Sequence, residues 1–162
     1  MIAAAQSRIF CGSEQQQSLA FGHLMVWTRG AYTISTDRTR LDLAMIHAFL
    51  STTYWAKDRP RDATVRAIAA SLPFGLYHGE RQLGFARVLT DYATVAYLAD
   101  VFVLPEARGR GLGAWLVETA MAHPELQHVR RWLLGTRDAH GLYRKFGFGP
   151  PNSERLMELV RE

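Results

Sequence analysis

Cysteine is almost absent from the 162-residue sequence, in which Cys11 is the only one. A single thiol cannot form an internal disulfide, so a disulfide-stabilised scaffold is excluded and a reducing, cytoplasmic location is expected. Long apolar runs are also absent, because no stretch of about 18 consecutive apolar residues occurs. The first ten residues contain Gln6, Ser7 and Arg8, which interrupt the apolar run too early for a secretory signal. We therefore expect neither a membrane span nor export.

Metal ligands are scattered along the sequence rather than grouped. Cys11 and the histidines do not stand at metal-site spacing with carboxylates, so we predict no metal site. The histidines considered are His23, His47, His78, His123 and His128. The net charge of +4 favours an anionic partner, such as a phosphorylated cofactor or an acidic substrate. Nucleic acid is not expected, because the sequence contains no recognised binding module and no aromatic platform.

The length and composition are those of one globular domain. Apolar residues make up 48% of the sequence and charged residues 21%, which is ordinary for a folded protein. Residues 1–30 differ from the rest because GSEQQQS is small and polar, and only residues 23–27 resemble a strand. We interpret residues 1–30 as an N-terminal extension, either an added strand or a loose tail, and residues 31–162 as the domain.

Periodicity predicts alternating strands and helices. Residues 31–35 resemble a strand, followed by a helix that Thr36 or Asp37 caps and that runs to residue 49. Residues 51–62 form a loop with exposed aromatics. A second amphipathic helix uses residues 65–72 and ends at Pro73. Three strands at 74–78, 82–90 and 94–104 follow, with separators short enough for antiparallel hairpins.

The C-terminal half predicts a crossover connection. A helix runs from residue 112 to just before His123, and residues 129–135 form a buried strand parallel to the 94–104 strand. A short helix over 138–146 is capped by Asp138 and ended by Gly147, and residues 155–160 alternate like a final strand. The order predicts a mixed three-layer α/β domain.

The segment LPEARGRGLGAWLVETA, residues 104–120, joins a strand end to a helix start through a glycine-rich turn. Unpaired backbone N–H groups and the positive end of the helix dipole make such a turn an anion site. Gly109, Gly111 and Gly113 let a phosphate approach, and Arg108 and Arg110 add positive charge. A diphosphate fits this turn. The turn lacks the Lys-Ser/Thr of the P-loop and the spacing of the dinucleotide fingerprint.

The turn Arg108-Gly109-Arg110-Gly111-Leu112-Gly113 resembles the R/Q-x-x-G-x-G/A motif of the GNAT superfamily of acyl-CoA-dependent N-acyltransferases. The segment GLYRKFGF, residues 141–148, is similar to a second segment of that family, L-Y-x-K-x-G-F. The resemblance covers roughly residues 31–160. It implies an α/β fold of the α+β type, whose mixed sheet has an antiparallel N-terminal part and a parallel pair splayed around the cofactor. It also implies acetyl transfer from acetyl-CoA to a primary amine.

The resemblance assigns roles to individual residues. It implies that the main chain of Val101 and Val103 binds the pantetheine arm of acetyl-CoA. It implies that Tyr143 hydrogen-bonds the cofactor sulfur and protonates the leaving thiolate, for which a phenol is a credible acid. The pyrophosphate would lie on the backbone amides of Arg108, Gly109, Arg110, Gly111, Leu112, Gly113 and Ala114.

The sequence departs from the family at the general base. Many relatives carry Glu where this chain has Ala99, and strand alternation turns the following Asp100 to the opposite face unless a bulge re-aims it. We therefore expect Asp100 to be structural, held by a basic partner. A water chain past Tyr97 could carry the proton instead, with or without His140. Thr136 stands where the family often has Asn.

The acceptor is not fixed by any motif. In the family the loop containing Tyr54 and Trp55 often walls the acceptor pocket, although these aromatics could equally pack the loop against the surface. Direct attack fits better than a covalent enzyme intermediate, since Cys11 is a poor nucleophile candidate. The missing Glu leaves open a catalytically weak or inactive acyl-CoA-binding sensor. A homodimer is open too, since relatives often dimerise.

Overall fold

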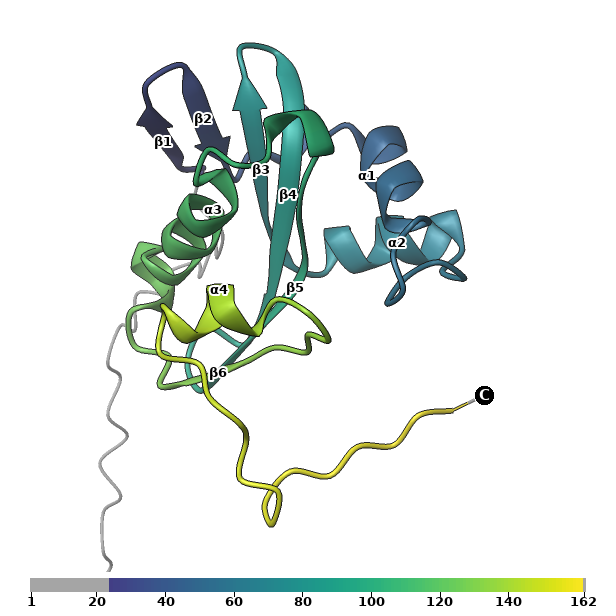
Figure 1. Ribbon diagram of the computed structural model, residues 1–162, viewed down its shortest axis with the longest axis vertical. Helices are drawn as coiled ribbons and strands as arrows, with labels where there is room; N and C mark the ends of the chain where they lie inside the picture. Colours follow the sequence, from purple (N-terminus) through teal and green to yellow (C-terminus); the bar gives the residue numbers. More distant parts are fainter. Residues whose placement is uncertain (1–23, 162) are drawn as a thin grey trace, which may run out of the picture.

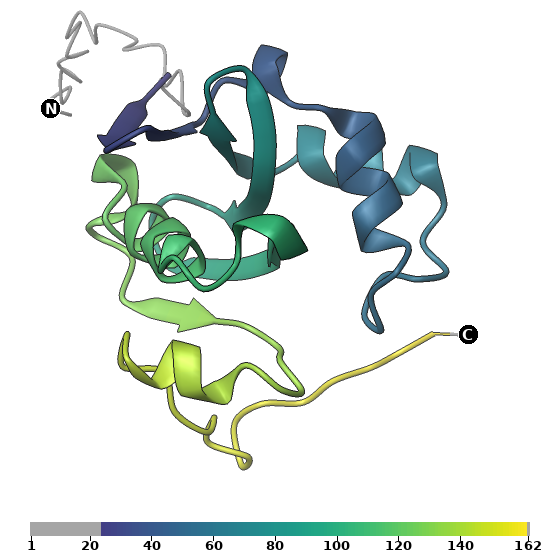
Figure 2. The ribbon, with the colours of Figure 1, turned by 45° about the horizontal axis from the view of Figure 1, so that its top comes forward.

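The computed structural model describes residues 24–161, which build a six-stranded sheet with helices on both faces (Figures 1 and 2). The strands lie side by side in chain order, and only the last pair is parallel. They are β1 (Val26–Arg29), β2 (Tyr32–Ser35), β3 (Leu72–His78), β4 (Arg81–Thr90), β5 (Val95–Val103) and β6 (Arg131–Leu133). The helices are α1 (Leu43–Leu50), α2 (Arg61–Ala69), α3 (Leu112–Met121) and α4 (His140–Arg144).

Two apolar clusters give the fold its three layers. On one face, Leu116 of α3 is fully buried in a cluster that also contains Phe74 of β3. On the other face, Ile46 of α1 and Ile68 of α2 belong to a cluster with Phe85 of β4. Figure 2 shows α3 on the opposite side of the sheet from α1 and α2, with α4 next to β6. The predicted mixed sheet, with three consecutive antiparallel strands and a parallel crossover to β6, is confirmed.

The helix caps differ from those predicted. Asp42, rather than Thr36 or Asp37, caps α1, because its side chain accepts the N–H of Met45 at 2.9 Å. Asp37 instead caps a short 3-10 helix, Arg38–Arg40. Four side chains that can cap a helix lie within residues 36–42, so the sequence offers several equivalent helix starts, and the structure uses Asp37 and then Asp42.

The predicted end of the second helix is wrong by several residues. Leu72 and Pro73 lie in β3, whereas α2 ends at Ala69. A proline is tolerated there because β2 pairs with β3 only from Gly75 to His78, so no strand lies beside Pro73 on that side. Leu72 is buried as the first residue of β3, and a buried apolar side chain fits either the end of a helix or the start of a strand.

The start of α4 also differs. Its N-cap is Ala139, whose backbone N–H donates to the hydroxyl of Thr136 at 3.0 Å, and Asp138 makes no cap hydrogen bond. Gly147 does follow the helix in the left-handed conformation, with φ of 86°.

The predicted C-terminal strand is also wrong, since residues 155–160 form no strand. Their apolar side chains Leu156, Met157, Leu159 and Val160 do not fall on one face of a strand, so a single sheet face could not bury them. The neighbouring edge strand β6 spans only three residues, which leaves little backbone for a six-residue partner.

The expected strand within residues 23–27 lies at Val26–Arg29, where β1 pairs with β2 as the outer strand of the sheet. Residues 1–23, including Cys11 and His23, lie outside the described residues. Within residues 24–161, no helix is long and apolar enough to cross a membrane.

Candidate active site

The parallel pair β5–β6 separates and leaves part of β5 with a free edge. The two strands pair only as far as Tyr97 and Leu133, after which β5 continues to Val103 beside β4 alone. A cavity of about 250 Å³ opens at this divergence, between β5, the loop before α2 and the loop before α4. Parallel strands that diverge expose backbone groups that a ligand can use.

The glycine turn presents a row of unpaired backbone donors at the start of α3. Gly109 and Gly111 both adopt left-handed backbone angles, with φ of 76° and 72°. A Cβ at either position would meet no atom within 4 Å, so the space in front of the turn is open. The N–H groups of residues 109–114 donate to no described residue. An anion could accept several of them together.

The two arginines of the turn have fixed contacts. The Nε of Arg108 donates to the carbonyl of Val103 at 3.0 Å, and Arg110 donates to the hydroxyl of Tyr32 at 2.6 Å. The first contact fixes the turn against the end of β5 and occupies the carbonyl of Val103, one of the two residues whose main chain the resemblance assigned to pantetheine. Val101, the other residue assigned to pantetheine, lines the cavity.

Tyr143 projects from α4 into the same cavity, with 9% of its surface exposed. Its hydroxyl has no hydrogen-bond partner in the part of the chain that the structure describes. Burial, with smaller contributions from Tyr54 and Asp138, raises the pKa of Tyr143 to about 12. The phenol is therefore protonated throughout the neutral range and can serve as a proton donor.

The aromatic residues predicted near the acceptor all line this cavity. Tyr54 is fixed from the opposite loop by Arg137, whose backbone N–H donates to the Tyr54 hydroxyl at 2.7 Å while its guanidinium lies 3.9 Å from the ring centroid. Trp55 packs edge-on against Tyr54, with 4.9 Å between the two ring centroids. Tyr97 lies against Gly135, where a Cβ would approach its hydroxyl to 3.1 Å. The loop before α2 and the loop before α4 thus meet over the cavity.

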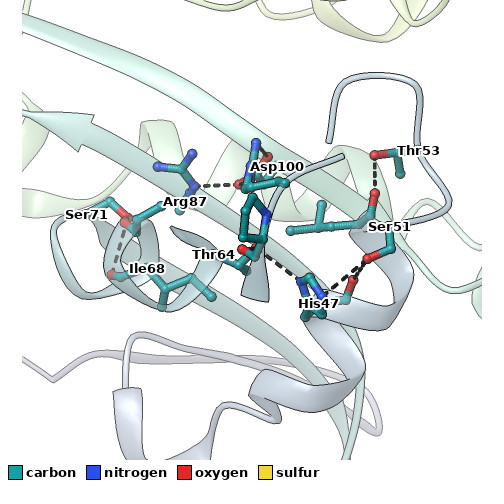
Figure 3. A network of polar contacts seen from close by, with 12 residues as sticks. His47, Ser51, Thr53, Thr64, Ile68, Ser71, Arg87 and Asp100 are labelled. Carbon is teal, nitrogen blue, oxygen red and sulfur yellow. Dashed lines mark hydrogen bonds and ion pairs between the residues drawn. The ribbon is translucent and has the colours of Figure 1, made fainter. Parts of the chain in front are cut away.

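Asp100 sits at a bulge, as the sequence allowed, but in a structural role. Its φ is 51°, and the register between β4 and β5 shifts beside it. Both carboxylate oxygens are occupied: Arg59 donates at 2.7 and 3.1 Å, and the Nε of Arg87 donates at 2.6 Å (Figure 3). Although burial alone would raise it, these arginines hold the pKa of Asp100 below its usual value. The carboxylate is unsuited to accept the substrate proton.

The cavity brings most of the predicted site together and adds residues that the sequence analysis missed. Ala99 and Thr136 line it, whereas His140 is exposed on α4 and is not among the lining residues. Arg59 and Arg87 were missed. The signal was present, since Arg87 and Asp100 are isolated charges in two otherwise apolar strands that were predicted to pair. Among the described residues no cluster of three or more metal ligands occurs.

Comparison with known proteins identifies the framework that carries this cavity. Residues 43–148 match the family described as "Acetyltransferase (GNAT) family", a span that includes the glycine turn and Tyr143. The chain belongs to the GNAT family of acetyltransferases. The sequence prediction of this family is confirmed.

GNAT relatives are found both by sequence and by structure. A candidate acetyltransferase of Gibberella zeae is 37% identical over 142 residues, which cover 74% of this chain and 79% of that protein. The crystal structure of a candidate GNAT acetyltransferase from Xanthomonas campestris pv. campestris shares 53% identity and a TM-score of 0.77, over 80% of this chain and 93% of that one.

An aminoglycoside N-acetyltransferase solved with CoA has the same fold. It shares 17% identity and a TM-score of 0.61, over 83% of this chain and 98% of its own. At this identity the likeness concerns the GNAT fold and not the acceptor.

Proposed function

We propose that this GNAT protein transfers an acetyl group from acetyl-CoA to a primary amine by direct attack. The observation that carries the proposal is that one cavity combines a protonated, unpartnered phenol at Tyr143 with the free edge of β5, next to the open amides before α3. A thioester whose carbonyl lies near Tyr143 would place its leaving sulfur within reach of a proton donor.

The open amides suit the diphosphate of acetyl-CoA. Residues 109–114 offer unpaired N–H groups, and the positive end of the ten-residue helix α3 lies behind them. Gly109 and Gly111 leave the approach free of side chains. We assign the diphosphate to the amides of residues 109–114 and the pantetheine arm to the main chain of Val101 and Val103. The amide of Arg108, which the resemblance included, already donates to the carbonyl of Pro105 at 3.2 Å.

The proposed reaction proceeds in one transfer, without an acetyl-enzyme. The acceptor ammonium first loses a proton to water, past Tyr97, and its nitrogen then attacks the thioester carbonyl carbon. A C–N bond forms, the C–S bond breaks, and Tyr143 gives its proton to the sulfur. The proton released from the amide nitrogen restores the phenol through solvent, so the net products are the acetylated amine, CoA and one proton. Asp100 takes no part, because its oxygens are occupied.

The test measures the release of free thiol from acetyl-CoA in the presence of a panel of primary amines. The second readout is the mass of the acceptor, which should rise by about 42 Da because one acetyl group replaces one hydrogen. We expect at least one amine to be acetylated in step with thiol release. Acetylation of the protein itself before transfer would contradict direct attack.

The sensor interpretation predicts a different result from the same protein. Ala99 favours it, since a carboxylate base is missing there. If calorimetry detects CoA binding while no amine releases thiol, the protein is a binding module and the proposed transfer is wrong.

Gly111→Ala is expected to weaken acetyl-CoA binding by at least about tenfold, because the added methyl group would occupy the open space next to the amides that bind the diphosphate. Gly30→Ala is the matched control, since Gly30 has φ of 58°, has equally open surroundings and lies in the β1–β2 turn. Both changes should cost about 1 kcal/mol of stability through left-handed strain. Equal acetyl-CoA affinity in Gly111→Ala and Gly30→Ala would contradict this assignment of the amides.

We also propose that the protein is a homodimer, covered by a second copy over its C-terminal segment. Met157, Leu159 and Val160 expose 95%, 79% and 76% of their surfaces, and adjacent exposed apolar side chains are typical of interfaces. Light scattering should give twice the chain mass of 18.3 kDa. Met157→Glu with Leu159→Glu should halve that value, whereas Glu158→Gln should not. A monomeric wild-type protein would contradict the proposal.

We further propose a cytoplasmic location, on the basis of the single cysteine in the sequence. Residues 31–162 are proposed as the acetyltransferase domain, and residues 1–30 as an extension whose final strand, β1, joins its sheet.

A further inference from the structure

The cavity beside Tyr143 has a cationic wall. Arg87 comes from β4 and Arg59 from the loop before α2, and both meet the carboxylate of Asp100. Only 9% of the Arg87 side chain and 23% of the Arg59 side chain are exposed, against 2% for Asp100. Two guanidinium groups with one carboxylate leave a net charge of +1 at a partly desolvated position, where its effect on a bound ion is large.

Arg87 keeps hydrogen-bonding capacity that the protein does not use. Arg59 spends both terminal nitrogens on Asp100, whereas Arg87 donates only through Nε. Figure 3 shows the Nε contact to Asp100, and the two terminal nitrogens of Arg87 donate to no described residue. A nearly buried guanidinium with unused donors is costly unless a ligand or water accepts them, and its planar fork matches a carboxylate.

The charges around the cavity suit an acceptor that carries both signs. Asp138, from the loop before α4, lines the cavity with Tyr143 and can attract the ammonium form of an amine. The Arg87 side of the cavity would repel a polycationic acceptor. The volume of about 250 Å³ lies below the usual range for drug-sized ligands, which favours a small molecule.

From these observations we infer that the acceptor is a small amino acid-like molecule, an amine with a carboxylate that the free terminal nitrogens of Arg87 bind. The amino group then points toward Tyr143 and the thioester. This inference rests on the proposed acetyl transfer and narrows its substrate class. Arg87 is a binding residue here, and Asp100 and Arg59 position it.

The test compares amino acids with their decarboxylated amines, which differ only in the group that Arg87 would bind. We expect kcat/KM with the best amino acid to exceed that of its decarboxylated partner by about tenfold to a hundredfold. Arg87→Gln should remove this preference by raising KM for the amino acid, with acetyl-CoA affinity unchanged. Arg87→Lys, which keeps the charge and loses the fork, should retain part of it. Arg81→Gln, which breaks an exposed pair with Glu106, is the matched control.

Equal kcat/KM for both members of each pair, or an equal loss for both in Arg87→Gln, would overturn the inference while leaving acetyl transfer intact. A binding experiment distinguishes failure of this inference from failure of the proposed acetyl transfer. Wild-type protein saturated with CoA is titrated with the same pairs, and Tm is recorded. If no amine releases thiol, the proposed transfer fails, and the acceptor role fails with it. Carboxylate binding by Arg87 is then tested separately: it holds if amino acids raise Tm and their decarboxylated partners do not, and it is overturned if the two raise Tm equally. The wild-type comparison also decides the matter if the Arg87 variants fail to fold.

Discussion

Replacing Tyr143 with phenylalanine is expected to lower kcat by about 10²–10⁴-fold, because the variant cannot protonate the leaving sulfur. The ring itself should stay in place, since it is buried and contacts Phe148 edge-on at 6.0 Å. Acetyl-CoA affinity should change little, as the diphosphate contacts lie at the start of α3. The measurement is steady-state thiol release together with calorimetric affinity.

Tyr77→Phe is a matched control for this experiment. Tyr77 is a buried tyrosine of β3 whose hydroxyl also lacks a hydrogen-bond partner within the described residues. Burial raises its pKa to about 12, as for Tyr143, but it does not line the cavity. We expect normal turnover in Tyr77→Phe. Unchanged turnover in Tyr143→Phe would remove the phenol from the mechanism.

The pH dependence provides a second readout of Tyr143. Because its pKa is raised to about 12, the phenol keeps its proton well beyond the pH at which an ordinary tyrosine, with a pKa near 10, would lose it. The loss of kcat that follows from removing this proton is therefore expected only above about pH 10, the pKa of an unperturbed tyrosine. A loss that centres on neutral pH and vanishes in Tyr143→Phe would contradict the assignment.

Asp100→Asn is expected to destabilise the fold by about 3–5 kcal/mol, because it leaves Arg87 and Arg59 without their counter-charge in a buried position. Asp62→Asn is the control. It breaks the exposed i,i+4 pair with Arg66 and should leave the urea midpoint close to that of the wild type, because solvent screens an exposed ion pair. Urea unfolding of the three proteins measures both effects. Unfolding of Asp100→Asn at the wild-type urea midpoint would contradict a structural role for this carboxylate.

The carboxylate of Asp100 should also make the stability of the fold depend on pH in the acidic range. The pKa of Asp100 is lower in the folded protein than in the unfolded chain, so its contribution is fully present above the unfolded value of about 4. The contribution is lost as the pH falls through the lower, folded-state pKa. Wild-type stability should therefore drop more steeply than that of Asp100→Asn as the pH falls below about 4. Parallel curves for the two proteins would count against the ion pairs.

Local patterns in the sequence predicted the framework of the site well. The hairpins of β3, β4 and β5 follow from alternating apolar residues and short separators, which depend only on neighbours in the chain. The glycine turn was located for the same reason, since Gly109 and Gly111 are needed where the backbone turns left-handed.

Contacts between distant residues could not be predicted in the same way. Arg59 and Asp100 are 41 positions apart, and nothing in the loop sequence distinguishes Arg59 from its basic neighbours. The absence of a strand at residues 155–160 likewise depends on the shortness of β6, which is set by where β5 and β6 diverge. Tertiary geometry, rather than local propensity, decides both.

The most direct measurement of the central proposal is a calorimetric titration of the whole protein with acetyl-CoA. If the amides of residues 109–114 hold the diphosphate, we expect one molecule to bind per chain, with Gly30→Ala binding as well as wild type and Gly111→Ala binding more weakly. A titration that produces no heat of binding, with no rise in the Tm of the folded protein, would contradict the proposal.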